Sequence, residues 1–426
     1  MDRHGSNEFD AIVVGSGPSG ATIARELSKQ KKKVLILERG GDAPLDEGFR
    51  TMASILNSVS VGDKQVSGAP RAFTTGGTSA VYFAVADQPP LELFRDLGID
   101  LSAALEDARR ELPLSILPDE LLGAQALRVQ RSALELGHRW KKNTMLIDLA
   151  KCNGGYTYEA KWNARTYLRE AVVHGATLVT RARVAKVLLD DGRAVGVEYK
   201  LIEKKKEVET RQAYGTKIVL AAGGAASPII LRNSGMKDVA SGGFYCHPTF
   251  GVYGIVPGLK AGDNFIASMG AEVEDGVGVG DANPARTLYR MMMLGHRRWI
   301  RLFRHSQSIG VGVMVKEGLG GVLRDDNRYS KQLTAEDHAK LQKGNEMARE
   351  IIRHAGGKHI YTSAAGAAHI GGVMKIGEHV DENLQTEYEN LHVCDGSVIP
   401  DTVKVAPTLT LICLGKYLAT RLMPAL

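Results

Sequence analysis

The chain has 426 residues, 54 of them basic and 48 acidic, with a net charge of +6. This balance is too even to indicate nucleic-acid binding, and the length predicts two or three domains. The four cysteines form no CxxC pair, so we expect reduced thiols and neither a disulfide framework nor a metal site. Residues 1–8 are polar and no apolar run is long enough to span a bilayer, so we expect a cytoplasmic protein without a signal peptide and without membrane contact.

The first forty residues predict a dinucleotide-binding unit. Residues 9–14 predict a buried parallel strand, a glycine-rich loop and a helix follow, and 34–37 predict a second strand that ends in an acid. In such a loop glycines permit the tight turn, the approach of a pyrophosphate and the close packing of the helix, whose N-terminus offers N–H groups to phosphates. The acid is expected to accept ribose hydroxyls. A glycine turn without a ligand is the alternative. The predicted cofactor-binding residues are Gly15, Ser16, Gly17, Pro18, Ser19, Gly20, Glu38 and Arg39.

Three later segments favour a flavin over a nicotinamide, because a flavin needs contacts far along the chain. Residues 178–200 predict a strand and a hairpin, and 217–224 predict another buried strand. Near the end of the sequence, 391–400 predict a short strand that delivers Asp395, and a helix begins at Thr408. This layout is typical of a protein whose nucleotide site is built by both ends of the sequence.

Five motifs in one order resemble those of the glucose–methanol–choline (GMC) oxidoreductase family. They occupy 76–79, 222–235, 244–248, 368–372 and 393–400. The chain resembles a short member, which implies a trimmed substrate domain, and its loop 76–82 has no histidine, which implies non-covalent FAD. The resemblance implies further cofactor contacts at Gly76, Gly77, Thr78, Ser79, Val184, Ala222, Asp395, Gly396, Pro407 and Thr408.

The resemblance also implies catalytic and electrostatic roles for particular residues. His369 stands where the family carries its catalytic histidine, and an imidazole suits a general base because its pKa lies near the operating pH. A buried histidine bonded to backbone is the alternative. Asp395 is expected to accept ribityl hydroxyls, with a surface-turn aspartate as the alternative. The helix opening at Pro407 is expected to stabilise negative charge on the reduced flavin.

One departure from the family's pattern bears on the chemistry. Relatives carry Asn or His before the proline that opens the last helix, and this chain has Ala406 there. The second catalytic side chain is therefore missing or is supplied from elsewhere. His247, in the 244–248 motif, is expected only to shape the junction between domains.

Together the motifs predict FAD-dependent oxidation of an alcohol (CH–OH) group to a carbonyl, by hydride transfer to flavin N5 with His369 as general base. A dehydrogenase is favoured over an oxidase. The alternatives are a family lyase with a structural flavin and a non-catalytic FAD-binding subunit. The expected partners are a small-molecule alcohol and a redox protein or small electron acceptor. The alcohol's identity and the oligomeric state stay open.

A basic stretch, 285–307, carries six arginines among apolar residues. It could dock a membrane surface or an acidic redox partner. An amphipathic cover with one solvated face is the more common explanation for such a stretch, and is the one we expect here.

The predicted fold is α/β, with an FAD-binding Rossmann-like domain built from discontinuous segments and a smaller α+β substrate domain. Residues 87–149 predict a helical excursion, in which the proline-punctuated residues 112–123 form a loop. A long helix is predicted after Thr334, the expected N-cap, with Asp337 three residues on. The predicted FAD-domain segments are 1–86, 150–250 and 362–426, and the substrate domain is 251–361.

Overall fold

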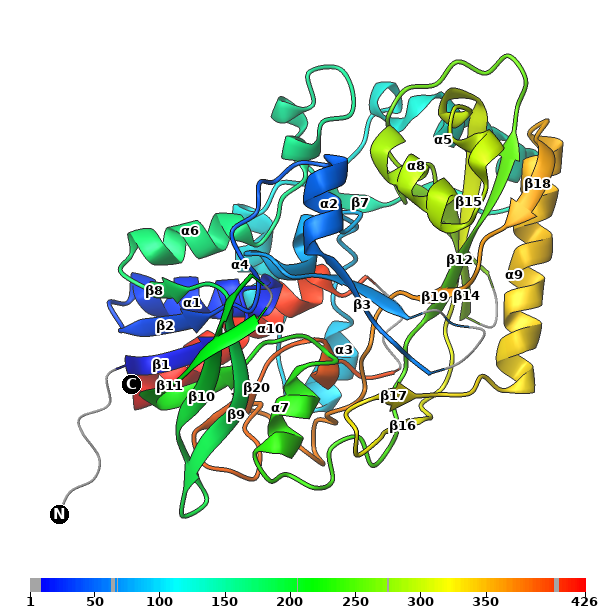
Figure 1. Cartoon of the computed structure of the whole chain (residues 1–426). Helices are drawn as coiled ribbons and strands as arrows, with labels where there is room; N and C mark the ends of the chain where they lie inside the picture. The colour runs from blue at the N-terminus through cyan, green and yellow to red at the C-terminus, as the bar shows by residue number, and fades with distance from the viewer. Residues whose placement is uncertain (1–8, 63–65, 67, 205, 274–275, 402–405) are drawn as a thin grey trace.

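The computed structural model describes residues 9–62, 66, 68–204, 206–273, 276–401 and 406–426, and two large sheets organise them (Figure 1). The predicted α/β class is confirmed. Within these ranges no helix is long and apolar enough to cross a bilayer. Residues 1–8, which bear on the predicted absence of a signal peptide, lie outside the described residues.

The first sheet contains the parallel strands of the nucleotide-binding unit. In spatial order its strands are β8 (Thr177–Val179), β2 (Val34–Leu37), β1 (Phe9–Val14), β11 (Lys206–Leu220), β10 (Arg193–Glu203) and β9 (Ala182–Asp190), and β20 (Leu391–Val393) also pairs with β11. All four residues of β2 are buried, as expected for a strand covered on both faces. Ile218 of β11 pairs with Ile12 on one side and with Leu391 on the other. Strands from both ends of the sequence therefore share this sheet.

The hairpin between β9 and β10 confirms the predicted turn near residue 191. Asp191 and Gly192 both have positive φ, +44° and +76°, the conformation that favours Asp-Gly in two-residue hairpins. The start of the hairpin is attached to the end of β2, because Ala182 N donates to Glu38 O at 2.8 Å and Arg181 N donates to Gly40 O at 2.8 Å. The hairpin therefore lies beside the predicted adenosine end of the site.

Helices from distant parts of the chain pack on one another beside this sheet. The first helix, α1 (Pro18–Lys29), packs against α6 (Arg165–Val173) and α10 (Thr408–Leu422), and α10 also packs against α4 (Ser102–Glu111). Helix α10 begins at Thr408, as predicted.

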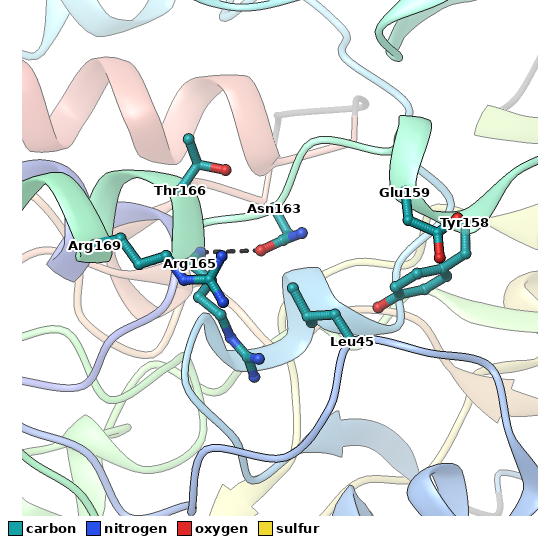
Figure 2. A pocket seen from close by; sticks show the side chains of 7 residues that line it. All are labelled: Leu45, Tyr158, Glu159, Asn163, Arg165, Thr166 and Arg169. Atoms are coloured by element: carbon teal, nitrogen blue, oxygen red, sulfur yellow. Dashed lines mark hydrogen bonds between the residues drawn. The ribbon is translucent and has the colours of Figure 1, made fainter. Parts of the chain in front are cut away.

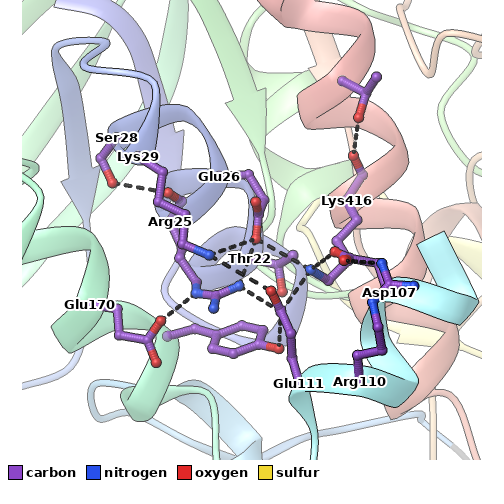
Figure 3. Close-up of polar contacts among 12 residues, drawn as sticks. Thr22, Arg25, Glu26, Ser28, Lys29, Asp107, Arg110, Glu111, Glu170 and Lys416 are labelled. Atoms are coloured by element: carbon purple, nitrogen blue, oxygen red, sulfur yellow. Dashed lines mark hydrogen bonds and ion pairs between the residues drawn. The ribbon is translucent and has the colours of Figure 1, made fainter. Parts of the chain in front are cut away.

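An ion-pair cluster joins these four helices (Figure 3). Glu111 accepts from Arg25 Nη1 at 2.7 Å, from Lys416 Nζ at 2.8 Å and from Tyr167 Oη at 2.9 Å. Burial raises the pKa of Glu111, but the hydrogen bonds from Arg25 and Lys416 outweigh burial and lower that pKa to about 2. The Arg25 guanidinium also lies over the Tyr167 ring, 4.1 Å from its centroid.

The second sheet is antiparallel and is covered by a long helix, α9 (Ala335–His354). In spatial order its strands are β18 (Lys358–Thr362), β12 (Pro248–Ile255), β15 (Ser308–Val315), β14 (Val277–Asp281), β13 (Met269–Val273) and β6 (Lys141–Lys142), and β19 (Gly366–Ala367) pairs with β12. The predicted capping box is present, since Asp337 N donates to Thr334 Oγ1 at 3.1 Å and Thr334 N donates to Asp337 Oδ2 at 2.9 Å. A Cβ on Gly344 would lie 2.4 Å from Val313 Cγ1, so this glycine permits the close approach of helix and sheet.

The predicted loop at 112–123 is wrong. Residues Leu114–Ile116 form β5, which pairs with β7 (Thr144–Leu146), and α5 (Asp119–Glu135) begins directly afterwards. Pro118 is the N-cap of α5, so this proline begins a helix, and Gly123, with φ of +78°, interrupts that helix. Besides short 3₁₀ helices, the remaining described helices and strands are α2 (Phe49–Ile55), β3 (Leu56–Val59), β4 (Ala69–Ala72), α3 (Leu91–Asp96), α7 (Ser227–Asn233), α8 (Arg286–Gly295), β16 (Val322–Leu323) and β17 (Tyr329–Ser330).

Candidate active site

The glycine-rich loop after β1 has the geometry that a pyrophosphate requires. Gly15 has φ of +103°, and a Cβ there would lie 2.3 Å from Ala221 O. A Cβ on Gly20 would lie 2.1 Å from Gly15 O, whereas the Cβ position of Gly17 has open space within 4 Å. Gly17 is the N-cap of α1, and no side chain in the described part of the chain caps this helix. The first-turn N–H groups therefore face a cradle that fits a phosphate.

Glu38 is buried at the end of β2 and is bonded to this loop. Its Oε2 accepts from Ser16 N at 3.1 Å and from Ser16 Oγ at 2.6 Å, and its Oε1 accepts from Gly40 N at 2.6 Å. Burial raises the pKa of Glu38 although these hydrogen bonds oppose the rise. Glu38 thus fixes the loop, and its bond to a ribose stays a prediction. Arg39 lies over the Phe73 ring, and Val184 is buried in β9 opposite Tyr199.

The loop 76–79 lies directly against the glycine-rich loop. Gly76 N donates to Ser16 Oγ at 3.1 Å, and a Cβ on Gly77 would lie 3.1 Å from Gly17 Cα. Ser79 is used within the protein, since its Oγ donates to Gly76 O at 2.6 Å and accepts from Ala164 N at 2.9 Å. Thr78 is exposed. The structure therefore brings the two predicted phosphate-binding loops together.

Asp395 connects the end of β11 to the C-terminal segment. It accepts from Gly223 N at 2.9 Å, Ser397 N at 2.9 Å, Ser397 Oγ at 2.7 Å and Ser227 Oγ. A carboxylate has about four acceptor positions, so these donors occupy all of them. The geometry favours a role for Asp395 in positioning the loops, and a direct bond to a ribityl hydroxyl stays a prediction.

Backbone packing joins the segment that carries His369 to the predicted cofactor contacts. A Cβ on Gly224 would lie 1.9 Å from Ile370 O, and a Cβ on Gly396 would lie 3.3 Å from the same oxygen. Ala222, nearby, donates its N–H to Ser227 Oγ at 3.1 Å. Three glycine-containing segments far apart in the sequence therefore meet at Ile370.

Among the described residues, no side chain caps the N-terminus of α10, where Pro407 is the N-cap and Thr408 is first in the helix. Within its first turn, Thr410 is fully buried, and its Oγ1 has no hydrogen-bond partner among the described residues. Ala406 N donates to Asp87 Oδ2 at 2.9 Å, which fixes the entry to the helix. These features fit a negatively charged part of a cofactor at this helix end.

Two histidines face each other beside these segments. His369 Nδ1 lies 3.3 Å from His247 Nδ1, and their rings are nearly perpendicular, with centroids 5.6 Å apart. The His247 ring also stacks on the Tyr245 ring, with centroids 4.5 Å apart. Burial, together with the adjacent His247, lowers the pKa of His369 to about 3, and burial lowers the pKa of His247 to about 4. Both rings are therefore neutral at pH 7.

A buried ion pair fixes the backbone of His247. His247 has φ of +46°, a left-handed conformation that is uncommon for a residue other than glycine. Its N–H donates to both oxygens of Glu317, at 3.1 and 3.0 Å, and Cys246 N donates to the same carboxylate. Glu317 pairs with Lys331 at 3.2 Å, and Lys331 Nζ also donates to Phe244 O at 2.8 Å. Sequence reasoning missed Glu317 and Lys331, and it gave His247 only a structural role.

Two cavities lie outside this site. One has a volume of about 170 Å³, and Figure 2 shows the side chains that line it. A larger one of about 420 Å³ is lined by residues that include Arg25 and Tyr167, and neither cavity is lined by a predicted site residue. Arg165 connects the smaller cavity to the nucleotide loops, because its guanidinium donates to Ala43 O at 2.7 Å and to Thr74 Oγ1 at 3.0 Å. The residues that line the smaller cavity are Leu45, Tyr158, Glu159, Asn163, Arg165, Thr166 and Arg169.

Comparison with known families identifies the class of protein. Models described as GMC oxidoreductase match residues 100–257 and 291–415, and a model of an NAD(P)-binding Rossmann-like domain matches 13–45. The two GMC models together cover more than half of the chain, which therefore belongs to the GMC oxidoreductase family. GMC oxidoreductases are FAD-binding flavoproteins, so the predicted family and cofactor are confirmed.

Individual relatives are distant. A GMC-type oxidoreductase of Mycobacterium tuberculosis is 29% identical over 254 residues, covering 53% of this chain and 39% of the relative. The chain thus matches about two fifths of the length of that relative. A long-chain-alcohol oxidase of Arabidopsis thaliana is 22% identical, covering 97% of this chain and 67% of the relative. The crystal structure of pyridoxine 4-oxidase from Mesorbium loti has a TM-score of 0.71 at 15% identity, covering 97% of this chain and 99% of that one, which shows a shared fold.

Proposed function

We propose that the chain oxidises the CH–OH group of an alcohol to a carbonyl with non-covalent FAD, and that His369 is the general base. The observation that carries the proposal is the neutral His247–His369 pair, adjacent to Ile370, whose carbonyl lies against Gly224 and Gly396. FAD, when bound, would supply the two-electron acceptor, taking the hydride of the carbinol carbon at N5. The residues that would hold it are the two glycine loops, the Asp395 segment and the start of α10.

The histidine pair can take up the hydroxyl proton. Because both rings are neutral, a hydrogen bond between the two Nδ1 atoms needs one Nδ1–H donor and one unprotonated acceptor. With His369 as the donor, its Nε2 carries a lone pair, and this atom would take the proton from the alcohol oxygen. The Nδ1 proton of His369 could then move to His247 Nδ1. In this arrangement His247 supplies the second polar side chain that is missing at Ala406.

The substrate class follows from the family and its named members. One relative is a long-chain-alcohol oxidase and one structural neighbour is a pyridoxine 4-oxidase, which favours an alcohol as the electron donor. Side chains of the second sheet would select the alcohol. The relatives, at 22% and 15% sequence identity, do not specify which alcohol that is. A screen should therefore include aliphatic, aryl, sugar and sterol alcohols.

In the experiment, candidate alcohols are added to the protein under anaerobic conditions, and reduction of the bound flavin is monitored by its absorbance. An alcohol substrate should bleach the flavin, and His369→Ala should keep FAD but slow bleaching by roughly 10²–10⁴-fold, the usual contribution of a positioned acid–base group. Product formation from an alcohol-derived substrate without bleaching would identify a lyase. No turnover with any donor class would identify a non-catalytic FAD-binding subunit.

The electron acceptor is measured in the same cell by admitting air to the reduced protein. The sequence predicts a dehydrogenase, for which reoxidation by air is much slower than flavin reduction. Peroxide formed at the turnover rate would instead identify an oxidase. Precipitation with acid should release free FAD into the supernatant, and flavin retained in the pellet would contradict non-covalent binding.

A further inference from the structure

Three large apolar side chains project into solvent after α8. Trp299 is 61% exposed, Ile300 is 88% exposed and Phe303 is 82% exposed. Single exposed apolar residues are ordinary on protein surfaces, but three large ones within five residues concentrate apolar surface on one short segment, which favours an interaction site. Helix α8 has the one buried face expected of an amphipathic cover, with Tyr289 and Met293 buried, whereas residues 299–303 turn their large apolar side chains to solvent.

The same segment is strongly basic. Residues 282–316 contain no Asp or Glu, and Arg297, Arg298 and Arg304 are exposed beside the apolar side chains. Arg286 and Arg290 of α8 are exposed as well. None of these five guanidinium groups forms an ion pair with a residue in the part of the chain that the structure describes. The surface therefore combines unneutralised positive charge with exposed apolar groups.

A small separate core supports this surface. Tyr253, Tyr289, Met293 and Tyr361 form a buried cluster beneath it. The Arg301 guanidinium lies over the Tyr361 ring, 4.4 Å from its centroid, and also donates to His359 O. The segment that carries the exposed side chains thus packs against a buried cluster contributed by α8 and by strands β12 and β18. Figure 1 shows α8 far from the parallel sheet.

We propose that this surface, formed by Trp299, Ile300 and Phe303 with Arg297, Arg298 and Arg304, docks onto an anionic lipid bilayer. The aromatic and aliphatic side chains would enter the boundary between headgroups and acyl chains, and the arginines would contact lipid phosphates. A purely acidic protein partner would match the charge but would leave Ile300 and Phe303 without an apolar environment. Docking revises the expectation of no membrane contact, which rested on the lack of a spanning segment.

Docking would bring the histidine pair near the lipid surface. Strand β12 begins at Pro248, next to His247, and reaches Tyr253 of the supporting cluster five residues later, about 17 Å away at the usual rise of a strand. The proposal does not depend on the oxidation chemistry, because it rests on exposure and charge alone.

The test is sedimentation of the full chain with vesicles of phosphatidylcholine alone and of phosphatidylcholine with phosphatidylglycerol. The wild type should sediment with the anionic vesicles, and high salt should release part of the bound protein from them. R297Q/R298Q/R304Q should bind roughly fivefold more weakly for each arginine removed. I300S/F303S should weaken binding at least about tenfold.

The matched control is V173S/R353Q, which changes an 82% exposed valine and an exposed arginine elsewhere. All the altered side chains are exposed, so folding and bound flavin should be unchanged in every variant. A wild type that stays in the supernatant with both vesicles overturns the proposal. So does I300S/F303S that binds as the wild type does, because the contact would then be purely electrostatic and would fit an acidic protein.

Discussion

The Nδ1 atoms of His247 and His369 lie 3.3 Å apart although the residues are 122 positions apart in the sequence. His369 follows β19 and His247 immediately precedes β12, and these two strands are paired through Ala367 and Pro248. The pairing of two short stretches of the second sheet thus creates the candidate catalytic pair. Because the rings adjoin, protonation of one disfavours protonation of the other.

The first prediction separates a chemical role of His247 from a structural one. His247→Asn and His247→Gly both tolerate a φ of +46°, but only asparagine keeps a polar atom near the Nδ1 position. His247→Gly should slow flavin reduction by roughly 10²-fold, and His247→Asn should lose less. Stopped-flow absorbance under anaerobic conditions measures both rates. Equal rates in the two variants and the wild type would mean that His247 only shapes the junction between domains.

The second prediction concerns the ion pair that holds His247. Lys331→Met leaves the Glu317 carboxylate buried without its cation, so the free energy of unfolding should fall by about 3–5 kcal/mol. The matched control is Lys151→Met, which breaks the exposed pair with Asp148 and should cost less than about 1 kcal/mol. Chemical denaturation followed by circular dichroism gives both values. A loss for Lys331→Met no larger than for the control would contradict the assigned role.

The third prediction concerns Glu38. Glu38→Ala removes the acceptor for Ser16 N, Ser16 Oγ and Gly40 N, so FAD should be retained less tightly, by about 1–3 kcal/mol. Glu38→Gln keeps one acceptor oxygen, so its affinity for FAD should lie between that of the wild type and that of Glu38→Ala. Equilibrium ultrafiltration with flavin fluorescence measures the affinity. An affinity unchanged in both variants would mean that the loop geometry does not depend on this carboxylate.

The fourth prediction is a pH dependence of stability. Burial raises the pKa of Asp281 from 3.8 to about 7, although Met269 N and Ser268 Oγ donate to it. The folded state then binds this proton more tightly than the unfolded state, so the group's stabilising contribution is full below pH 3.8 and is lost as pH rises toward 7. Asp281→Asn should flatten that part of the profile and raise the free energy of unfolding at pH 8 by up to about 4 kcal/mol.

Denaturant titrations at several pH values test this dependence. Asp96→Asn, at an exposed position on α3, is the control and should leave the profile unchanged. A wild-type slope that persists in Asp281→Asn between pH 4 and 7 would assign the dependence to other groups.

Local patterns predicted the elements whose signals are local. The apolar runs of β1 and β2, the Asp-Gly hairpin and the Thr334–Asp337 capping box all follow from neighbouring residues. The prediction of a loop at 112–123 is wrong because it treats Pro118 as a residue that interrupts secondary structure, whereas Pro118 begins helix α5.

The site was only partly predictable. The motifs indicated His369, and its partner stayed hidden because the contact depends on strand pairing and on Glu317, 70 residues beyond His247. Asp395 was recognised, but the four donors that occupy it come from backbone and serine groups on separate segments. The exposure of Ile300 and Phe303 could not be read from periodicity, because an amphipathic pattern does not say which face is covered.

The contact between the first and last helices sets an order of assembly. Lys416 on α10 bonds to Glu26 on α1 across 390 positions, and β20 completes the sheet that β1 begins. A chain emerging from the ribosome presents the glycine-rich loop early, whereas the Asp395 segment and α10 emerge more than 350 residues later. Contacts between residues this far apart in the sequence form slowly and late in folding. The cofactor cradle can therefore form only after α10 has been synthesised, so flavin capture comes late in the folding of this chain.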